Sequence, residues 1–473
     1  MSEPTLIQGG MGAAVSNWRL ARAVSTAGQL GVVSGTALDT IFARRLQNGD
    51  LDMLRALEQF PLKEMAQRVK DRYFISGGKK IEEPYRRVPM HSAKTALPVV
   101  ELTIVANFAE VYLAKEGHEG LVGVNYLEKI QTPTLPSLYG AILAGVDYVL
   151  MGAGIPRAIP GILALLCQHK KASLKLYVDG ATSEEVFETT FDPSQFAPMQ
   201  MPPLKNPKFL AIVSSAVLAL TLARKSSGAV SGFVIEGPTA GGHNAPPRGE
   251  LTLNENGEPI YGSRDEVNLK EIEKLGLPFW LAGFYGTPEK FKQALEQGAC
   301  GVQVGTAFAY CDESGLTDEI KAKVLDKVRN GSVRIFTDPL ASSSGYPFKV
   351  VQLEGSLSEE EVYQDRPRVC DLGYLRSAYK KEDGSLGFRC PGEPVDEYVR
   401  KGGDLKDTIG RKCLCNALLA NVGMPTVQPN GYVEKTLVTS GDALSEIGGF
   451  LKEGATSYSA RDVIDQILGR ASI

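Results

Sequence analysis

Short apolar runs rich in Val, Ile, Leu and Phe recur along the chain and alternate with segments of helical periodicity. The apolar runs end at glycine or at short polar residues, and they lack a polar face. Both features are typical of strands that are buried on both sides. We predict eight such strands, at Thr5–Gln8, Leu30–Ser34, Leu121–Asn125, Tyr148–Met151, Phe209–Ser214, Gly232–Ile235, Phe279–Ala282 and Gly301–Val304.

The segments between these strands have the spacing of amphipathic helices, and several are followed by glycine. Clear examples are Asn17–Ala27, Pro136–Ala144, Ala216–Lys225 and Pro288–Gln297. Strict alternation of strand and helix favours a parallel sheet, and eight repeats favour an α/β fold of the (βα)8 TIM-barrel type. An open, doubly wound sheet is the alternative.

Three segments exceed what a minimal barrel over 1–343 needs. Residues 37–92 are too long for one crossover, and the helical spacing of 50–73 predicts a helical insertion there. Residues 173–207 form an excursion in which 173–178 and 185–191 alternate like a hairpin, followed by a proline-rich stretch. Residues 344–473 no longer follow the barrel pattern, and we expect a mainly helical C-terminal cap.

Glycine and small polar residues gather at the carboxyl ends of the predicted strands. TIM-barrel enzymes hold their active sites on this face, and glycine lets a ligand approach the backbone closely. We therefore expect a planar cofactor there, with its phosphate near the backbone that follows the last two strands. The candidate cofactor-binding residues are Gly9, Gly10, Met11, Asn125, Glu236, Gly241, Gly242, Gly283, Gln303, Gly305 and Thr306.

His243 is the candidate catalytic residue. It follows the predicted strand Gly232–Ile235 in the run FVIEGPTAGGHN, where proline and two glycines prevent the strand from continuing. The imidazole pKa lies near neutral pH, which suits a general base. The other three histidines lie in a loop, in a turn and at a basic helix end, without a comparable frame. A hydrogen-bonded loop histidine is the plainer alternative for His243.

The composition excludes several classes of protein. The formal net charge of −4, without a dense Lys/Arg tract, argues against nucleic-acid binding. We expect no membrane-spanning segment, and the N-terminus lacks a signal-sequence pattern, so we expect a cytoplasmic protein. Seven cysteines fit a reducing compartment. Four of them, Cys370, Cys390, Cys413 and Cys415, gather in the tail without C-x-x-C spacing, and we predict no metal site.

Several sequence frames resemble the nitronate monooxygenase family, formerly called 2-nitropropane dioxygenases. The frames occur in the family's order between about residues 6 and 314. They are QGGMGAAVSNWRLARAVSTAGQLGVVSG (8–35), VGVN (122–125), GAGIP (152–156), EGPTAGGHN (236–244) and GACGVQVGTAFAYCDES (298–314).

The resemblance implies an FMN-dependent TIM barrel with His243 as the catalytic base. It also implies that Gln303–Thr306 and Gly283 hold the phosphate side of FMN, and that Gly10, Met11 and Asn125 flank the flavin. Two departures stand out. Phe284 occupies the place of the family's second glycine after the seventh strand, and Glu236 stands where nitronate monooxygenases often have glutamine. Flavin-type enoyl-ACP reductases, which belong to the same superfamily, have glutamate there.

Three functions follow from these patterns. The first is oxidation of alkyl nitronates with O₂, with His243 taking the α-proton of a neutral nitroalkane. The second is reduction of an enoyl thioester with NAD(P)H, with His243 stabilising the enolate oxygen. The third is a non-enzymatic FMN-binding scaffold. The first two predict a small-molecule partner, and the oligomeric state, including a homo-oligomer, stays open.

Overall fold

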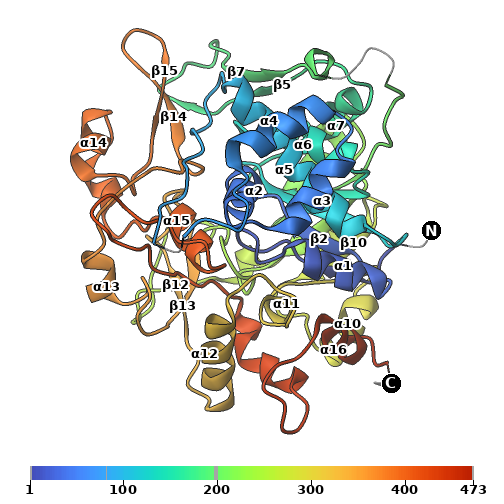
Figure 1. The fold of residues 1–473 in the computed structure, drawn as a ribbon. Helices are drawn as coiled ribbons and strands as arrows, with labels where there is room; N and C mark the ends of the chain where they lie inside the picture. The colour runs from blue at the N-terminus through green and yellow to red at the C-terminus, as the bar shows by residue number, and fades with distance from the viewer. Residues whose placement is uncertain (1–2, 81, 197–200, 471–473) are drawn as a thin grey trace.

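The structure is a computed structural model that describes residues 3–80, 82–196 and 201–470. Eight parallel strands form its central sheet, in the order β1-β11-β10-β9-β8-β4-β3-β2. The two end strands meet, because the Gln8 amide donates to the Leu30 carbonyl at 2.9 Å and the Leu30 amide donates to the Leu6 carbonyl at 3.1 Å. The sheet therefore closes into a barrel, and the predicted (βα)8 fold is confirmed (Figure 1).

All eight predicted strands belong to this barrel, with ends shifted by one or two residues. Their bounds are β1 Leu6–Gln8, β2 Gly31–Ser34, β3 Val122–Leu127, β4 Tyr148–Gly152, β8 Lys208–Val213, β9 Gly232–Glu236, β10 Phe279–Ala282 and β11 Gly301–Val304. Asn125 lies inside β3 rather than at its end, since the pairing with β4 continues through Leu127. Glu236 is the last residue of β9.

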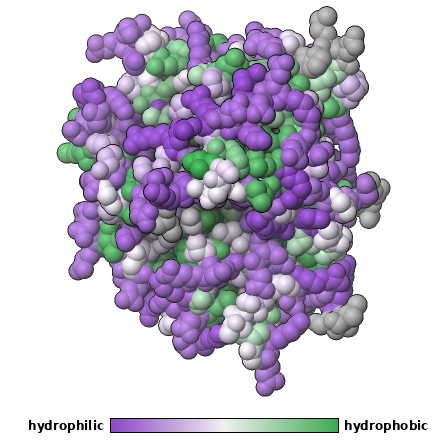
Figure 2. Space-filling model, viewed as in Figure 1, coloured by the Kyte–Doolittle hydropathy of each residue, from purple (hydrophilic) through white to green (hydrophobic). Residues whose placement is uncertain are grey.

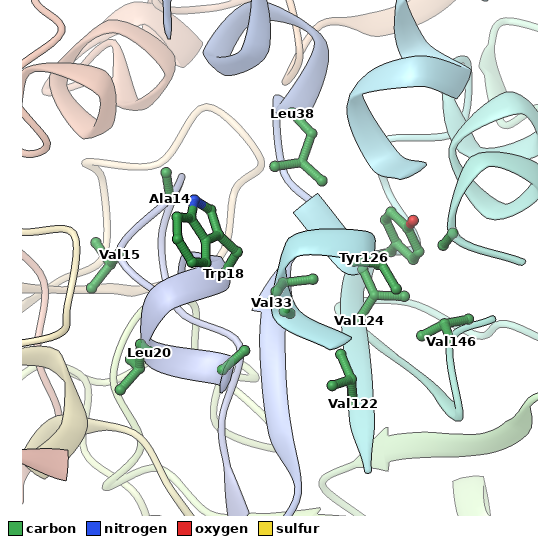
Figure 3. Close-up of a cluster of buried hydrophobic side chains, with 14 of the residues drawn as sticks. Ala14, Val15, Trp18, Leu20, Val33, Leu38, Val122, Val124, Tyr126 and Val146 are labelled. Carbon is green, nitrogen blue, oxygen red and sulfur yellow. The ribbon is translucent and has the colours of Figure 1, made fainter. Parts of the chain in front are cut away.

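The helices that alternate with the strands cover the outside of the barrel. They are α1 Trp18–Thr26, α6 Thr134–Leu143, α7 Ile159–Cys167, α8 Ala216–Lys225, α9 Leu269–Glu273, α10 Pro288–Glu296 and α11 Thr306–Ala309. The side chain of Asn17 caps α1 by accepting the Leu20 amide, and Ser215 caps α8 in the same way. Figure 3 shows Trp18 and Leu20 of α1 beside Val33 of β2 and the valines of β3.

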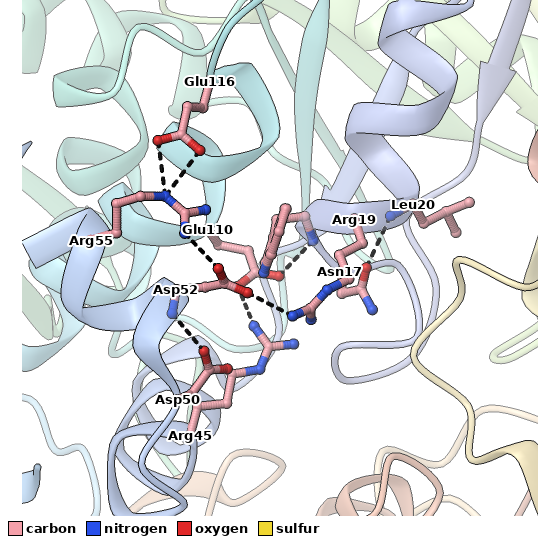
Figure 4. Close-up of polar contacts among 10 residues, drawn as sticks. Asn17, Arg19, Leu20, Arg45, Asp50, Asp52, Arg55, Glu110 and Glu116 are labelled. Carbon is pink, nitrogen blue, oxygen red and sulfur yellow. Dashed lines mark hydrogen bonds and ion pairs between the residues drawn. The ribbon is translucent and has the colours of Figure 1, made fainter. Parts of the chain in front are cut away.

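The predicted helical insertion is confirmed and contains α2 Leu38–Gln47, α3 Leu51–Gln59 and α4 Lys63–Tyr73. It packs on α5, Leu97–Lys115, which leads into β3. Ion pairs bind the insertion to its surroundings: Asp52 of α3 joins Arg19 of α1 at 2.7 Å, and Arg45 of α2 joins Glu110 of α5 at 2.7 Å (Figure 4).

Among the described residues one helix, α5, is long and apolar enough to cross a membrane, although no such segment was expected from the sequence. However, 78% of its apolar window is buried inside the protein, where Glu101 and Glu110 accept bonds from Arg68 and Arg45. A buried helix of this kind is typical of the core of a globular protein.

The predicted hairpin excursion is only partly right. Strands β5, Ala172–Lys175, and β7, Glu188–Phe191, pair in antiparallel fashion as expected. Val178–Asp179, expected as part of the hairpin, instead forms β6 and pairs with β14, Ser377–Lys380, in the tail. The proline-rich stretch that follows lies partly outside the described residues. The excursion thus bridges the barrel and the tail.

The tail contains the expected helices, together with short strands and long loops. Its elements are β13 Phe348–Val351, which pairs with β12 Ile335–Asp338, β14 Ser377–Lys380, β15 Leu386–Arg389, α13 Glu360–Gln364, α14 Val395–Arg400, α15 Leu414–Ala420 and α16 Ala460–Ile467. The helix α12, Asp318–Arg329, connects the barrel to β12. The face seen in Figure 2 is largely hydrophilic, with smaller apolar patches.

Candidate active site

A cavity of about 450 Å³ opens at the carboxyl ends of the barrel strands. The structure brings all the predicted site residues to its wall, although they belong to five separate strands or to the loops after them. These residues are Gly9, Gly10, Met11, Asn125, Glu236, Gly241, Gly242, His243, Gly283, Gln303, Gly305 and Thr306. The barrel face inferred from the glycine pattern is therefore the face that carries the cavity.

The floor of the cavity presents two amide side chains with unused oxygens. The Asn125 Oδ1 and Gln303 Oε1 atoms are buried and have no hydrogen-bond partner among the described residues. The Asn125 Nδ2 atom donates only a long bond, 3.4 Å, to the Gly10 carbonyl. Buried polar groups are rarely left unpaired. A planar ligand with donors and acceptors along its ring edge would satisfy both amides, whichever way each amide is turned.

Glycine is required beside these amides. A Cβ atom added to Gly10 would lie 2.4 Å from the Asn125 Cβ atom, far inside the contact distance of two carbon atoms. A Cβ atom added to Gly9 would lie 3.4 Å from the Gln303 Cγ atom, which is an ordinary contact, so the close approach is required at Gly10 alone. The backbone of the first loop thus lies directly against the Asn125 side chain, with no side chain of its own between them. This leaves room in the cavity for a ligand.

The opposite end of the cavity lies between the loops after β10 and β11. Gly283 has φ +80°, and an added Cβ atom would lie 2.8 Å from the Thr239 Oγ1 atom. Phe284 has φ 64°, a left-handed conformation that favours glycine. Phenylalanine therefore adopts a strained backbone conformation at this position. The expectation that the phosphate loop differs locally from a double-glycine loop stays a prediction.

Segments of the tail complete this end of the cavity. The Gly441 amide donates to the Thr306 Oγ1 atom at 3.0 Å, and the Gly242 amide donates to the Thr439 Oγ1 atom at 2.9 Å. Thr306 keeps its own hydroxyl proton to donate to a ligand. Thr439 and Gly441 were not predicted, because both are remote from the barrel strands along the chain.

His243 is held by the tail as well. It forms an antiparallel bridge with Phe348, whose ring centroid lies 4.9 Å from that of the imidazole. The His243 Nε2 atom lies 2.7 Å from the Ser342 Oγ atom, which lies 2.8 Å from the Ser344 Oγ atom. The sequence analysis missed both serines, since they become neighbours of His243 only through this bridge. One imidazole nitrogen is thereby fixed in direction.

The surroundings of His243 favour a neutral imidazole. Burial lowers the pKa of His243 to about 4, and the ammonium group of Lys129 acts in the same direction. Lys129 donates to the Ser344 carbonyl at 3.3 Å and lies 3.0 Å from the centre of the Tyr346 ring. Burial lowers the pKa of Lys129 itself to about 8. At neutral pH the imidazole therefore has a lone pair available to accept a proton.

Glu236 faces the same cavity from the end of β9. Burial raises the pKa of its carboxyl group to about 7. A neutral carboxyl group offers one O–H donor and one carbonyl acceptor, the same combination that a glutamine amide offers. The glutamate is therefore compatible with either type of flavin enzyme, and its presence alone does not separate them.

These features fit FMN. The unpaired amide oxygens of Asn125 and Gln303 suit the polar edge of a flavin ring, and the close backbone at Gly10 leaves room for a flat group. Thr306 and the loop at Gly283 offer a place for one phosphate.

Comparison with known proteins agrees with the fold and with the family resemblance. Residues 168–339, a segment that includes β8–β11 and His243, match the family model described as nitronate monooxygenase. None of the curated proteins compared with the chain gives a significant match. The fold is that of a TIM barrel, and the part of it over 168–339 is similar to nitronate monooxygenases.

Solved structures with a similar fold cover nearly the whole chain. The structure of FabK from Thermotoga maritima has a TM-score of 0.50 and 15% identity, covering 99% of this chain and 92% of that one. A nitroalkane oxidase from Streptomyces ansochromogenes has a TM-score of 0.45 and 14% identity, with 98% and 94% covered. The enoyl reductase domain of MlnA from Bacillus amyloliquefaciens has a TM-score of 0.47 and 12% identity, with 98% and 93% covered. At 15% identity, the likeness to FabK extends to the fold alone.

Proposed function

We propose that this protein is an FMN-dependent oxidoreductase that oxidises alkyl nitronates with O₂, and that His243 is its catalytic base. The observation that carries the proposal is the joint position of His243 and the two unpaired amides, Asn125 and Gln303, on one cavity at the barrel mouth. The family match over 168–339 supports the substrate class. Bound FMN supplies electron acceptance and reaction with O₂.

The described residues account for the handling of the proton. A neutral nitroalkane must lose its α-proton before it can be oxidised, and the uncharged His243 imidazole can accept that proton. The nitronate anion so formed favours the protonated imidazole beside it, because opposite charges at short distance stabilise each other. Ser342 holds the ring in position through the 2.7 Å contact to Nε2.

The test compares His243→Asn with the unchanged protein on two forms of one substrate. We expect the variant to keep its fold and bound FMN, because the cofactor contacts come mainly from glycine backbone and amides. Turnover of the neutral nitroalkane, followed by O₂ consumption, falls ~10²- to 10⁴-fold. Turnover of the preformed nitronate falls far less. His118→Asn, whose imidazole bonds to the Ala114 carbonyl outside the cavity, serves as the matched control.

Equal turnover of the neutral substrate by His243→Asn and the unchanged protein would end the assignment of the base. An equal loss on both substrate forms would instead move His243 to anion binding or electrostatic stabilisation.

Anaerobic mixing separates the proposed function from its alternatives. The FMN-loaded protein is mixed separately with NADH, NADPH and a nitronate, and the flavin absorbance is followed. The proposal expects a rapid change with nitronate and little with either pyridine nucleotide. Rapid bleaching by NADH or NADPH selects the enoyl thioester reductase. A flavin that no donor reduces selects the scaffold.

A further inference from the structure

A separate cavity of about 480 Å³ lies between the helical insertion and the tail. One wall comes from α2 and residues 84–88, and the other comes from residues 371–372 and from the loop 426–431. None of its lining residues lines the cavity at the barrel mouth. A volume of several hundred Å³ is typical of sites for small molecules. The cavity can therefore hold a ligand of its own.

The most unusual group in its wall is the guanidinium of Arg44. Three arginines are buried among the described residues, and two of them face a carboxylate: Arg45 pairs with Glu110 and Arg366 pairs with Glu434, each at 2.7 Å. Arg44 is 5% exposed and forms no ion pair with the described residues. Buried charges are normally paired, because removal of a charge from water is costly. Arg44 therefore lacks the counter-charge that its two buried counterparts have.

Neutral groups hold Arg44 in position. Its Nη1 atom donates to the Met424 carbonyl at 2.5 Å, and its Nη2 atom donates to the Thr426 Oγ1 atom at 2.8 Å. Its guanidinium carbon lies 4.8 Å from the centre of the Tyr85 ring. These contacts fix the group but bring no negative charge, and a guanidinium has further N–H donors to offer.

Two more arginines line the same cavity. Arg86 donates to the Arg72 carbonyl, and Arg87 forms no hydrogen bond or ion pair with the described residues. Asp371 is the one carboxylate in the described lining, and the Asn416 amide donates to it at 2.7 Å. Three guanidinium groups and one carboxylate give the lining a formal charge of +2. The cavity is therefore suited to an anion.

The tail side of the cavity contributes an unused acceptor. Gln428 is 3% exposed, and its Oε1 atom has no hydrogen-bond partner among the described residues. The amide nitrogen of Gln428 donates to the Glu434 Oε1 atom at 2.8 Å, and this bond to a carboxylate fixes which end of the amide is the oxygen. Buried acceptors are rarely left unpaired. A ligand with an O–H or N–H donor beside its anionic group suits this wall.

The charge of the lining separates the possible classes of anion. A phosphate monoester carries about −1.5 to −2 at neutral pH, which matches the formal +2, whereas a single carboxylate would leave part of that charge unmatched. Terminal phosphate oxygens accept bonds from several guanidinium groups at once, and the planar guanidinium fits phosphate in a bidentate manner. The ester group can supply the donor that the Gln428 Oε1 atom lacks.

We propose that this cavity binds the phosphate monoester of a small molecule, a sugar phosphate or a nucleotide, and that Arg44 and Arg87 contact the phosphate. The proposal does not depend on which substrate or cofactor the barrel mouth takes.

A bound ligand would join two segments that both reach the active site. The loop before α2 contains Thr36, which lines the cavity at the barrel mouth, and Arg44 lies on α2 itself. The tail, which provides Gln428, also provides Ser342, the residue that holds His243. The ligand would therefore stabilise the contact between the insertion and the tail.

The test is calorimetric titration of the full chain with glycerol 3-phosphate, in the presence of saturating FMN. We expect about one glycerol 3-phosphate per chain in addition to the flavin. Arg44→Met and Arg87→Gln should each weaken its binding at least ~10-fold, because each removes a charge-assisted contact to phosphate. Arg224→Gln, which changes an exposed guanidinium on α8 outside the cavity, is the matched control and should retain the affinity.

Thermal unfolding gives a second reading and checks the fold of the variants. Without ligand, Arg44→Met should unfold at or above the temperature of the unchanged chain, because it removes a buried charge that has no counter-ion. Saturating glycerol 3-phosphate should raise the unfolding temperature of the unchanged chain but not that of Arg44→Met. Arg87 is exposed, so Arg87→Gln gives an answer even if Arg44→Met fails to fold.

Titration with AMP identifies the source of the phosphate. Binding of AMP at least ~10-fold tighter than that of glycerol 3-phosphate would assign a nucleotide, and similar or weaker binding would assign a sugar phosphate. Both results uphold the site.

Three results would overturn it. The first is that neither ester binds to the FMN-saturated chain. The second is that inorganic phosphate or succinate binds more tightly than both esters, which would assign a free ion or a dicarboxylate. The third is unchanged affinity in folded Arg44→Met and Arg87→Gln, which would place the bound ester elsewhere.

Discussion

Gly10→Ala tests whether the contact between the first loop and Asn125 shapes the cofactor site. The added Cβ atom would lie 2.4 Å from the Asn125 Cβ atom, whereas carbon atoms pack at ~3.5 to 4.0 Å. Either the loop or Asn125 must therefore move by ~1 Å. Overpacking of this kind costs ~1–3 kcal/mol. If that cost falls on the FMN-bound arrangement, FMN affinity weakens ~5- to 150-fold.

The assay is titration of the cofactor-free protein with FMN, followed by the quenching of flavin fluorescence. Gly237→Ala is the matched control, since it lines the same cavity and its added Cβ atom meets nothing closer than the Thr239 Oγ1 atom at 3.9 Å. We expect the control to bind FMN within ~2-fold of the unchanged protein. Unchanged affinity in a folded Gly10→Ala protein would show that the flavin does not rest on this loop.

Other predictions concern strain, pH and the tail. Phe284→Gly should be more stable than Phe284→Ala by ~1 kcal/mol in urea unfolding. Both variants lose the aromatic ring, but only glycine adopts the backbone angle φ 64° without strain. Equal stabilities of the two variants would show that the backbone is not strained at this position. Burial raises the pKa of Glu236 to about 7 in the folded protein, above the value near 4.5 of the unfolded chain. The stabilisation from this carboxyl group is therefore complete when the pH is below 4.5, and it is lost as the pH rises through 7. Glu236→Gln should therefore gain melting temperature relative to the unchanged protein at pH 8 but not at pH 4.5, and a pH-independent difference would refute the shift. Thr439→Val removes the hydroxyl that accepts the Gly242 amide hydrogen bond. FMN binding should weaken by a few-fold in the same titration, which corresponds to a loss of ~1 kcal/mol of binding free energy. Unchanged FMN affinity would show that this hydrogen bond does not contribute to cofactor binding.

The barrel could be predicted from the sequence because its signals are local. Each buried strand is a short apolar run that ends at glycine or a small polar residue, and those ends mark one face of the barrel before any pairing is known. His243 and the glycines at 9–10, 241–242 and 283 were found in this way, and the structure places all of them on the cavity.

The parts that escaped prediction depend on contacts between distant segments. Ser342 meets His243 only because the tail strand at Phe348 pairs with the loop after β9. Val178 leaves its expected hairpin because β14 offers a partner from the tail. Arg44 of the insertion and Gln428 of the tail line one cavity, although they are far apart along the chain. Local patterns carry no information about such pairings.

Identification of the bound flavin tests the central claim most directly. The purified protein is saturated with FMN and FAD in separate samples, desalted, denatured, and its released flavin is chromatographed. The account predicts about one FMN per chain and little retained FAD, because the cavity offers one phosphate end at Gly283 and Thr306 and the chain has no dinucleotide fingerprint. Stoichiometric FAD, or no flavin retained from either sample, would contradict the account.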